Sequence, residues 1–108
     1  MRSAGLPAAP FARIAAMDET IDPLGRVVHL VEERWQHIVN GHPYMTPFRV
    51  EVLQAVEAPT DLIEQPRPGQ DWFYLRDAGP SRWLKVVVAF DEDSVGSIRT
   101  AFPRRSKP

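Results

Sequence analysis

Imidazoles, cations, a phenol and a hydroxyl follow one another along this chain in four short segments. The segments are residues 35–43, 74–76, 82–88 and 99–102. Side chains of these types can move protons and bind phosphates without a metal, because imidazoles exchange protons near neutral pH and cations stabilise developing negative charge. Acid/base chemistry is therefore the reaction that these residues could perform.

His37 and His42 are the candidates for proton transfer. Val31, Trp35 and Ile38 recur at helical spacing and form one apolar stripe, and His37 lies well away from the centre of that stripe. An exposed histidine on the polar side of a helix is the ordinary alternative for His37. His42 follows the expected helix end, where it could instead cap backbone carbonyls.

Tyr74, Arg76 and Lys85 are candidates on two expected strands. Tyr74 and Arg76 share one face of their strand, so the phenol could stack on a base or move a proton while the guanidinium holds a phosphate. The alternative is an exposed face with Arg76 stacked on an aromatic ring. Lys85 interrupts an apolar strand, either as an edge residue that deters aggregation or as a charge partner for a transition state.

Thr100 is the candidate hydroxyl of the last expected strand, where it could bind a non-bridging phosphate oxygen. Arg99 precedes it, and Arg104 lies in the basic tail at residues 103–108. Both arginines are candidate substrate-binding cations. Threonine is also an ordinary strand residue.

The elements that would position these residues are two helices and four strands. The apolar period predicts a helix over 31–40, which Gly41 ends at the C′ position, and a second helix that Thr46 caps, Pro47 begins and Pro59 ends. Strand-like runs at 61–64, 71–76, 82–91 and 94–102 alternate with turn signals. Two shorter strands are expected at 11–17 and 26–30, with a turn between them at 21–25.

This order predicts an α+β fold in which two N-terminal helices pack on a four-stranded antiparallel sheet. Leu84, Val86, Val88 and Phe90 should face the helices, and Trp83, Lys85 and Val87 the other side. If Ile98 and Phe102 also face the core, Thr100 falls on the opposite face from Lys85 unless a bulge changes the register.

Composition limits the classes of protein that remain. The 108 residues, 44% hydrophobic and 25% charged, suit one soluble domain (1–108) with a loose leader at 1–10. The absence of cysteine excludes thiolate zinc sites, disulfides and a cysteine nucleophile, and neither a metal nor another cofactor is expected. No apolar run approaches the ~20 residues that span a bilayer, so a cytosolic location is expected.

The net charge of −1 does not favour bulk attraction to nucleic acid, but the charges are unevenly distributed. Residues 1–64 carry 5 basic and 9 acidic groups, whereas residues 65–108 carry 8 basic and 5 acidic groups. A local basic face could therefore bind phosphates, although an ordinary solvated surface explains the same counts.

The pattern Trp-x-His-Ile-x3-His-Pro, a tyrosine-bearing strand, Leu-Lys-Val-Val-Val and a final Arg-Thr-Ala-Phe resembles the phage-associated nucleases of the barnase–EndoU–colicin–RelE-like group, over residues 27–103. The element order is also similar to that of BrnT toxins. The resemblance implies a metal-independent ribonuclease, with His37 and His42 as early-helix histidines, Tyr74, Arg76 and Lys85 as strand positions, and Thr100 as the last-strand hydroxyl.

The leading hypothesis is thus a toxin-like or phage-derived endoribonuclease that acts on RNA, with an antitoxin or immunity protein as a possible partner. Two other classes remain open. One is a non-catalytic RNA- or protein-binding module on the same scaffold. The other is a structural partner protein in which Trp72, Tyr74 and Trp83 form an interaction face.

Overall fold

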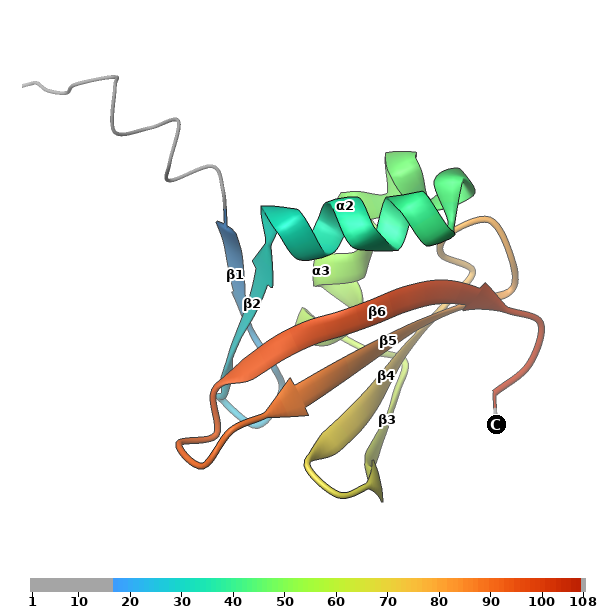
Figure 1. Cartoon of the computed structure of the whole chain (residues 1–108). Coiled ribbons are helices and arrows are strands. Elements are labelled where there is room, and N and C mark those ends of the chain that lie inside the picture. Colours follow the sequence, from blue (N-terminus) through green and yellow to red (C-terminus); the bar gives the residue numbers. More distant parts are fainter. Residues whose placement is uncertain (1–16, 108) are drawn as a thin grey trace, which may run out of the picture.

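The computed structural model of the chain describes residues 17–107, which form a six-stranded sheet with helices on one face (Figure 1). The strands are β1 (Met17–Ile21), β2 (Val27–Val31), β3 (Asp61–Arg67), β4 (Gln70–Arg76), β5 (Trp83–Phe90) and β6 (Gly96–Arg104). Between β2 and β3 lie α2 (Glu32–Gly41), the 3-10 helix η1 (Pro43–Phe48) and α3 (Arg49–Glu57). The predicted leader at 1–10 and the predicted strand at 11–17 lie outside the described residues, except for Met17.

The prediction of two N-terminal helices on a four-stranded antiparallel sheet is wrong. The strand order is β1-β2-β6-β5-β4-β3, and the β1–β2 hairpin precedes both helices. The sheet is mixed because β2 runs parallel to β6 through two residue pairs, Val28 with Gly96 and His29 with Ser97. So short a ladder has no pattern of its own in the sequence, and its existence depends on how the whole sheet packs.

The helix boundaries also differ in detail from the prediction. Gly41 is the last residue of α2 and has no positive φ, so it is not a left-handed C′ glycine. Thr46 does not cap α3, because residues 43–48 form η1 first and its hydroxyl donates to the carbonyl of Pro43 at 2.7 Å. Glu32 and Glu33 occupy the first turn of α2, where negative charges interact favourably with the positive end of the helix dipole.

Strand β5 divides the sheet into two faces. Leu84, Val86 and Val88 are fully buried and belong to the core that α2 and α3 cover, as their alternation predicts. Trp83, Lys85 and Val87 point to the other face, against which no helix of residues 17–107 packs. We call this second side of the sheet the open face.

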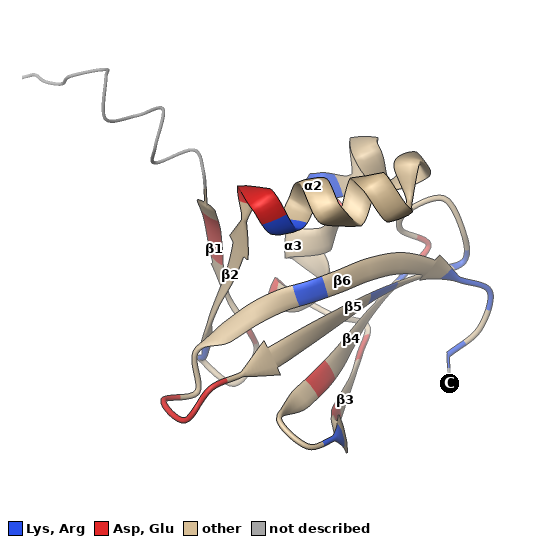
Figure 2. Cartoon of the chain, in the orientation of Figure 1, with Lys and Arg blue, Asp and Glu red and all other residues tan. Residues whose placement is uncertain are grey.

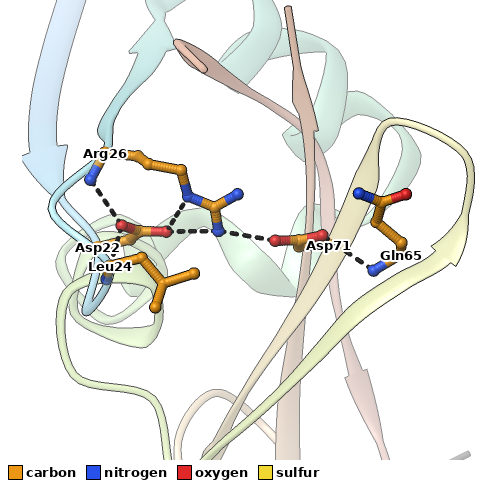
Figure 3. Close-up of polar contacts among 5 residues, drawn as sticks. All are labelled: Asp22, Leu24, Arg26, Gln65 and Asp71. Carbon is orange, nitrogen blue, oxygen red and sulfur yellow. Dashed lines mark hydrogen bonds and ion pairs between the residues drawn. The ribbon is translucent and has the colours of Figure 1, made fainter.

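Arg26 joins the β1–β2 turn to strand β4 by ion pairs (Figure 3). Its guanidinium lies 2.7 Å from the carboxylates of both Asp22 and Asp71, which are nearly completely buried, and 3.7 Å from the ring centroid of Phe90. Asp22 also accepts hydrogen bonds from the amides of Leu24 and Arg26, which closes the predicted turn. The buried carboxylates therefore have well-defined partners.

Charged residues are segregated along the sheet (Figure 2). Acidic residues occupy the β5–β6 turn at 91–93, and basic residues occupy the C-terminal end of β6 and the segment that follows it. In the part of the chain that the structure describes, no helix is both long and apolar enough to cross a membrane.

Gly96→Ala is expected to destabilise the fold, because an added Cβ would lie 2.7 Å from Phe90, 2.8 Å from Val88 and 3.0 Å from Val28. Overpacking at such a point costs about 1–3 kcal/mol. Urea denaturation followed by circular dichroism would measure the free energy of unfolding.

Gly41→Ala is the matched control, since an added Cβ there meets nothing within 4 Å. Its stability should stay the same or rise by up to about 1 kcal/mol, because alanine is the better helix former. Equal stability of the two variants would contradict the close approach of β2 and β6.

Candidate functional site on the open face

Lys85 lies at the centre of the open face with its ammonium against aromatic rings. Its Nζ is 3.4 Å from the ring centroid of Trp72, 5.7 Å from that of Phe102 and 5.8 Å from that of Tyr74. The residue is only 5% exposed, and no described carboxylate forms an ion pair with it. A nearly buried lysine without a counter-charge is rare in proteins.

Burial lowers the pKa of Lys85 from its ordinary value of 10.5, and the cations of Arg104 and Arg67 lower this pKa further. Cation–π contacts in a desolvated setting contribute about 2 kcal/mol. These contacts stabilise the ammonium, but no carboxylate of residues 17–107 neutralises its charge. An anion bound here would supply the missing charge.

Two neutral donors beside Lys85 also lack partners. Tyr74 Oη and Trp72 Nε1 are buried, and neither has a hydrogen-bond partner among the described residues. Burial is the main cause that raises the pKa of Tyr74; the carboxylate of Asp61 raises it as well, whereas Arg104 lowers it. Tyr74 therefore keeps its proton at neutral pH and remains a donor, and unsatisfied buried donors are exceptional enough to require an explanation.

A β-bulge in β6 decides which side chains accompany Lys85. Val88 pairs with Ile98 and Val87 with Thr100, so Arg99 has no partner on β5. The extra residue reverses the alternation. Ile98 faces the core, whereas Thr100, Phe102 and Arg104 lie on the open face with Lys85.

His42 approaches the open face from the end of α2. Its ring stacks on Phe102, with centroids 5.8 Å apart and an interplanar angle of 26°, and its Nδ1 is 2.8 Å from the hydroxyl of Tyr44. The ring of Phe102 thus contacts both the imidazole of His42 and the ammonium of Lys85. When Nδ1–H donates to Tyr44, Nε2 is left to accept a proton.

The remaining predicted residues are not all at this site. Arg76 lies on the open face but is mostly exposed, with its guanidinium 5.7 Å from the ring centroid of Trp83. Arg99 is exposed at the bulge, and its carbonyl accepts a hydrogen bond from Arg34. His37 is exposed in a separate depression with Val31, Glu33 and Arg34, and the structure does not bring it to Lys85.

The open face thus holds Tyr74, Lys85, Thr100 and Arg104 of the predicted set, with Arg76 at its margin and His42 at its edge. Sequence reasoning did not name Phe102 as a site residue. It took Phe102 to face the core unless a bulge changed the register, and nothing in the residues around Arg99 indicates a bulge. It named Trp72 as part of an alternative interaction face with Tyr74 and Trp83, although period two from Tyr74 also places it beside Lys85.

The chain after β6 turns back across the open face. Lys107 forms an ion pair with Asp61 on β3 and lies 5.3 Å from the ring centroid of Trp83. The hydrogen bond from Lys107 is the main cause that lowers the pKa of Asp61. Both side chains are partly exposed, so this pair contributes little to stability and can be displaced.

The arrangement as a whole is suited to a phosphate next to a flat ring. Lys85, Arg104 and Thr100 can bind non-bridging oxygens, the aromatic side chains can stack on a base, and His42 can exchange a proton. Within residues 17–107, no three His, Asp or Glu side chains lie close enough together to hold a metal ion.

Comparison with protein-family models, curated proteins and solved structures finds no match to this chain. The resemblance to the phage-associated nucleases therefore stays a prediction.

Lys85→Met is expected to stabilise the protein in a phosphate-free buffer at pH 7, by on the order of 1 kcal/mol, because methionine fills the site without a buried charge. The pKa of Lys85 is lower in the folded state than in the unfolded state. As the pH rises, Lys85 therefore loses its proton in the folded protein before it does so in the unfolded protein. The difference in free energy of unfolding between Lys85→Met and the wild type consequently shrinks as the pH approaches about 10. Urea denaturation between pH 7 and pH 9.5 would follow the difference.

Lys107→Met, at the other lysine of the chain, serves as the control, and it should change stability by less than about 1 kcal/mol. A Lys85→Met protein that is clearly less stable than the wild type at pH 7 would show that the aromatic rings alone satisfy the ammonium.

Proposed function

We propose that this protein is a metal-independent endoribonuclease that cleaves RNA by acid/base catalysis on the open face. The observation that supports this most strongly is the position of the Lys85 ammonium. It lies among aromatic rings, no carboxylate of residues 17–107 pairs with it, and it contacts Phe102, which also stacks on His42. In cleavage of a phosphodiester, a proton acceptor activates the attacking hydroxyl and a cation stabilises the developing charge, while stacking rings can hold the bases.

In the proposed reaction, His42 Nε2 accepts the proton of the 2′-hydroxyl, and the 2′-oxygen forms a bond to phosphorus. The bond from phosphorus to the 5′-oxygen breaks, and Lys85 donates a proton to the leaving oxygen. Burial lowers the pKa of Lys85, which makes its ammonium a stronger acid than an exposed lysine. The products are a 2′,3′-cyclic phosphate and a free 5′-hydroxyl.

Other open-face residues would hold the substrate. Arg104 and the hydroxyl of Thr100 bind non-bridging oxygens of the phosphate, and the neutral hydroxyl of Tyr74 donates a further hydrogen bond. Trp72 and Phe102 offer flat surfaces for bases, each already within reach of Lys85. Arg76 is exposed and would bind a phosphate further along the RNA backbone.

One observation favours a second candidate, a non-catalytic RNA-binding module that uses the same face. His37 is remote, so His42 is the one imidazole that the described chain brings to the edge of this face. If Lys85 does not act as the acid, the face would still stack bases and bind phosphates without cleaving them.

Purified protein is expected to cleave mixed cellular RNA in the presence of EDTA and to leave 2′,3′-cyclic phosphate ends. His42→Ala should slow single-turnover cleavage by about 10²–10⁴-fold, because it removes the base. Lys85→Met should slow it by at least about 10²-fold, since the developing charge then lacks its nearest cation. Gel electrophoresis and mass spectrometry of the ends would measure both effects.

His37→Ala is the matched control and should cleave at the wild-type rate, since this residue lies away from the open face. Binding of RNA without cleavage by the folded wild type would favour the binding module instead. A wild type that neither binds nor cleaves RNA would sink both proposals.

A further inference from the structure

An open depression of about 630 Å³ lies between the β4–β5 turn and the segment after β6. Asp77, Ser81, Arg82 and Arg105 line it. The hydrogen bond from the amide of Asp77 to the carbonyl of Arg82 closes the turn at 2.6 Å and fixes one wall. Arg105, which follows the last residue of β6, forms the opposite wall.

The depression carries more positive than negative charge. Arg82 and Arg105 are exposed, and neither forms an ion pair with a carboxylate of residues 17–107, whereas Asp77 lies 4.0 Å from the guanidinium of Arg76. Guanidinium groups present paired donors that match phosphate oxygens, and the hydroxyl of Ser81 adds one more donor. The chemistry of the lining thus suits a phosphate.

The depression lies at the end of β5 and β6 where Trp83 and Arg104 are found. Trp83 pairs with Arg104, so Arg82 and Arg105 flank this pair at the same end of the two strands. Lys85 is two residues further along β5 on the open face, roughly 7 Å from Trp83 along the strand. Figure 2 shows basic residues concentrated at this end of β6 and in the segment after it.

The ion pair of Lys107 with Asp61 also bears on the depression. It links the segment that carries Arg105 to β3, while the pair itself, being exposed, adds little to stability. A strand of RNA that reaches Lys85 would therefore meet Trp83 and then two guanidinium groups.

We infer that Arg82, Arg105 and Ser81 form a second phosphate subsite, which binds the RNA backbone next to the phosphate held at Lys85. This inference rests on the proposed function only in taking RNA as the ligand of the open face, and it does not require cleavage. The subsite would make affinity depend on the length of the RNA, because a dinucleoside monophosphate has no second phosphate to offer.

Binding is tested with a short fluorescein-labelled oligouridylate whose 2′-hydroxyls are methylated, so that it cannot be cleaved. Fluorescence anisotropy over a range of salt concentrations is expected to show weaker binding by R82Q and R105Q, with the slope of log K against log salt reduced by about 0.7 for each. S81E should weaken binding further, because it places a carboxylate in the subsite. R34Q, on α2, is the control of equal charge change and should retain the wild-type slope.

Circular dichroism would confirm that these variants are folded. A dinucleoside monophosphate, measured by competition, should bind R82Q and R105Q as it binds the wild type but bind Lys85→Met less well. Wild-type slopes for R82Q and R105Q, together with weak binding by Lys85→Met, would overturn the subsite and leave the proposed function intact. A reduced slope without any RNA cleavage by the wild type would support the subsite and remove only the nuclease.

Discussion

Lys85 must keep a charged ammonium on the central strand of a sheet whose other face is fully occupied by the core. Leu84 and Val86, one residue to either side on β5, are completely buried under the helices, so alternation forces Lys85 to the open face. There it meets Trp72, Phe102 and other flat rings rather than a carboxylate. The fold therefore holds one ammonium against aromatic rings, unpaired with any carboxylate of residues 17–107, and the other candidate residues of the open face lie around it.

Two other partly buried cations of residues 17–107, Arg26 and Arg49, are each paired with two carboxylates, unlike Lys85. Arg26 has two buried carboxylates and an aromatic ring as partners, and it ties the β1–β2 turn to β4 (Figure 3). Arg49 on α3 pairs with Asp18 on β1 and Glu32 on α2 at 2.7 Å each. Both arginines join elements that are distant in sequence, and hydrogen bonds to their partners raise their pKa values although burial opposes this. Lys85, which is more deeply buried than either arginine, has aromatic rings but no carboxylate of residues 17–107 as its partner.

Much of the local structure could be predicted, because it depends on periodicity and turn chemistry over a few residues. The β2 strand, both main helices, the four later strands and the two faces of β5 follow from patterns around residues such as Trp35, Val52 and Val86. The predicted fold class was wrong because the β1–β2 hairpin joins β6 through distant pairs. Val28 and Gly96, which pair, are nearly seventy positions apart in the sequence. Such pairing depends on a close approach that Gly96 permits, and a lone glycine within an expected strand does not reveal its partner.

The sequence by itself determined which residue types are present, which alternate on a strand, and that no thiol could take part in the chemistry. It placed Tyr74, Lys85 and Arg76 correctly relative to their own strands, because side-chain alternation is a property of the backbone. Only the tertiary structure decided which candidates meet. One unpaired residue, Arg99, turns Thr100 and Phe102 toward Lys85, and the end of α2 brings His42 but not His37 to Phe102. The reason is physical: the register between strands and the position of a helix end are fixed by packing across the whole sheet, and neither is encoded in the residues that they bring together.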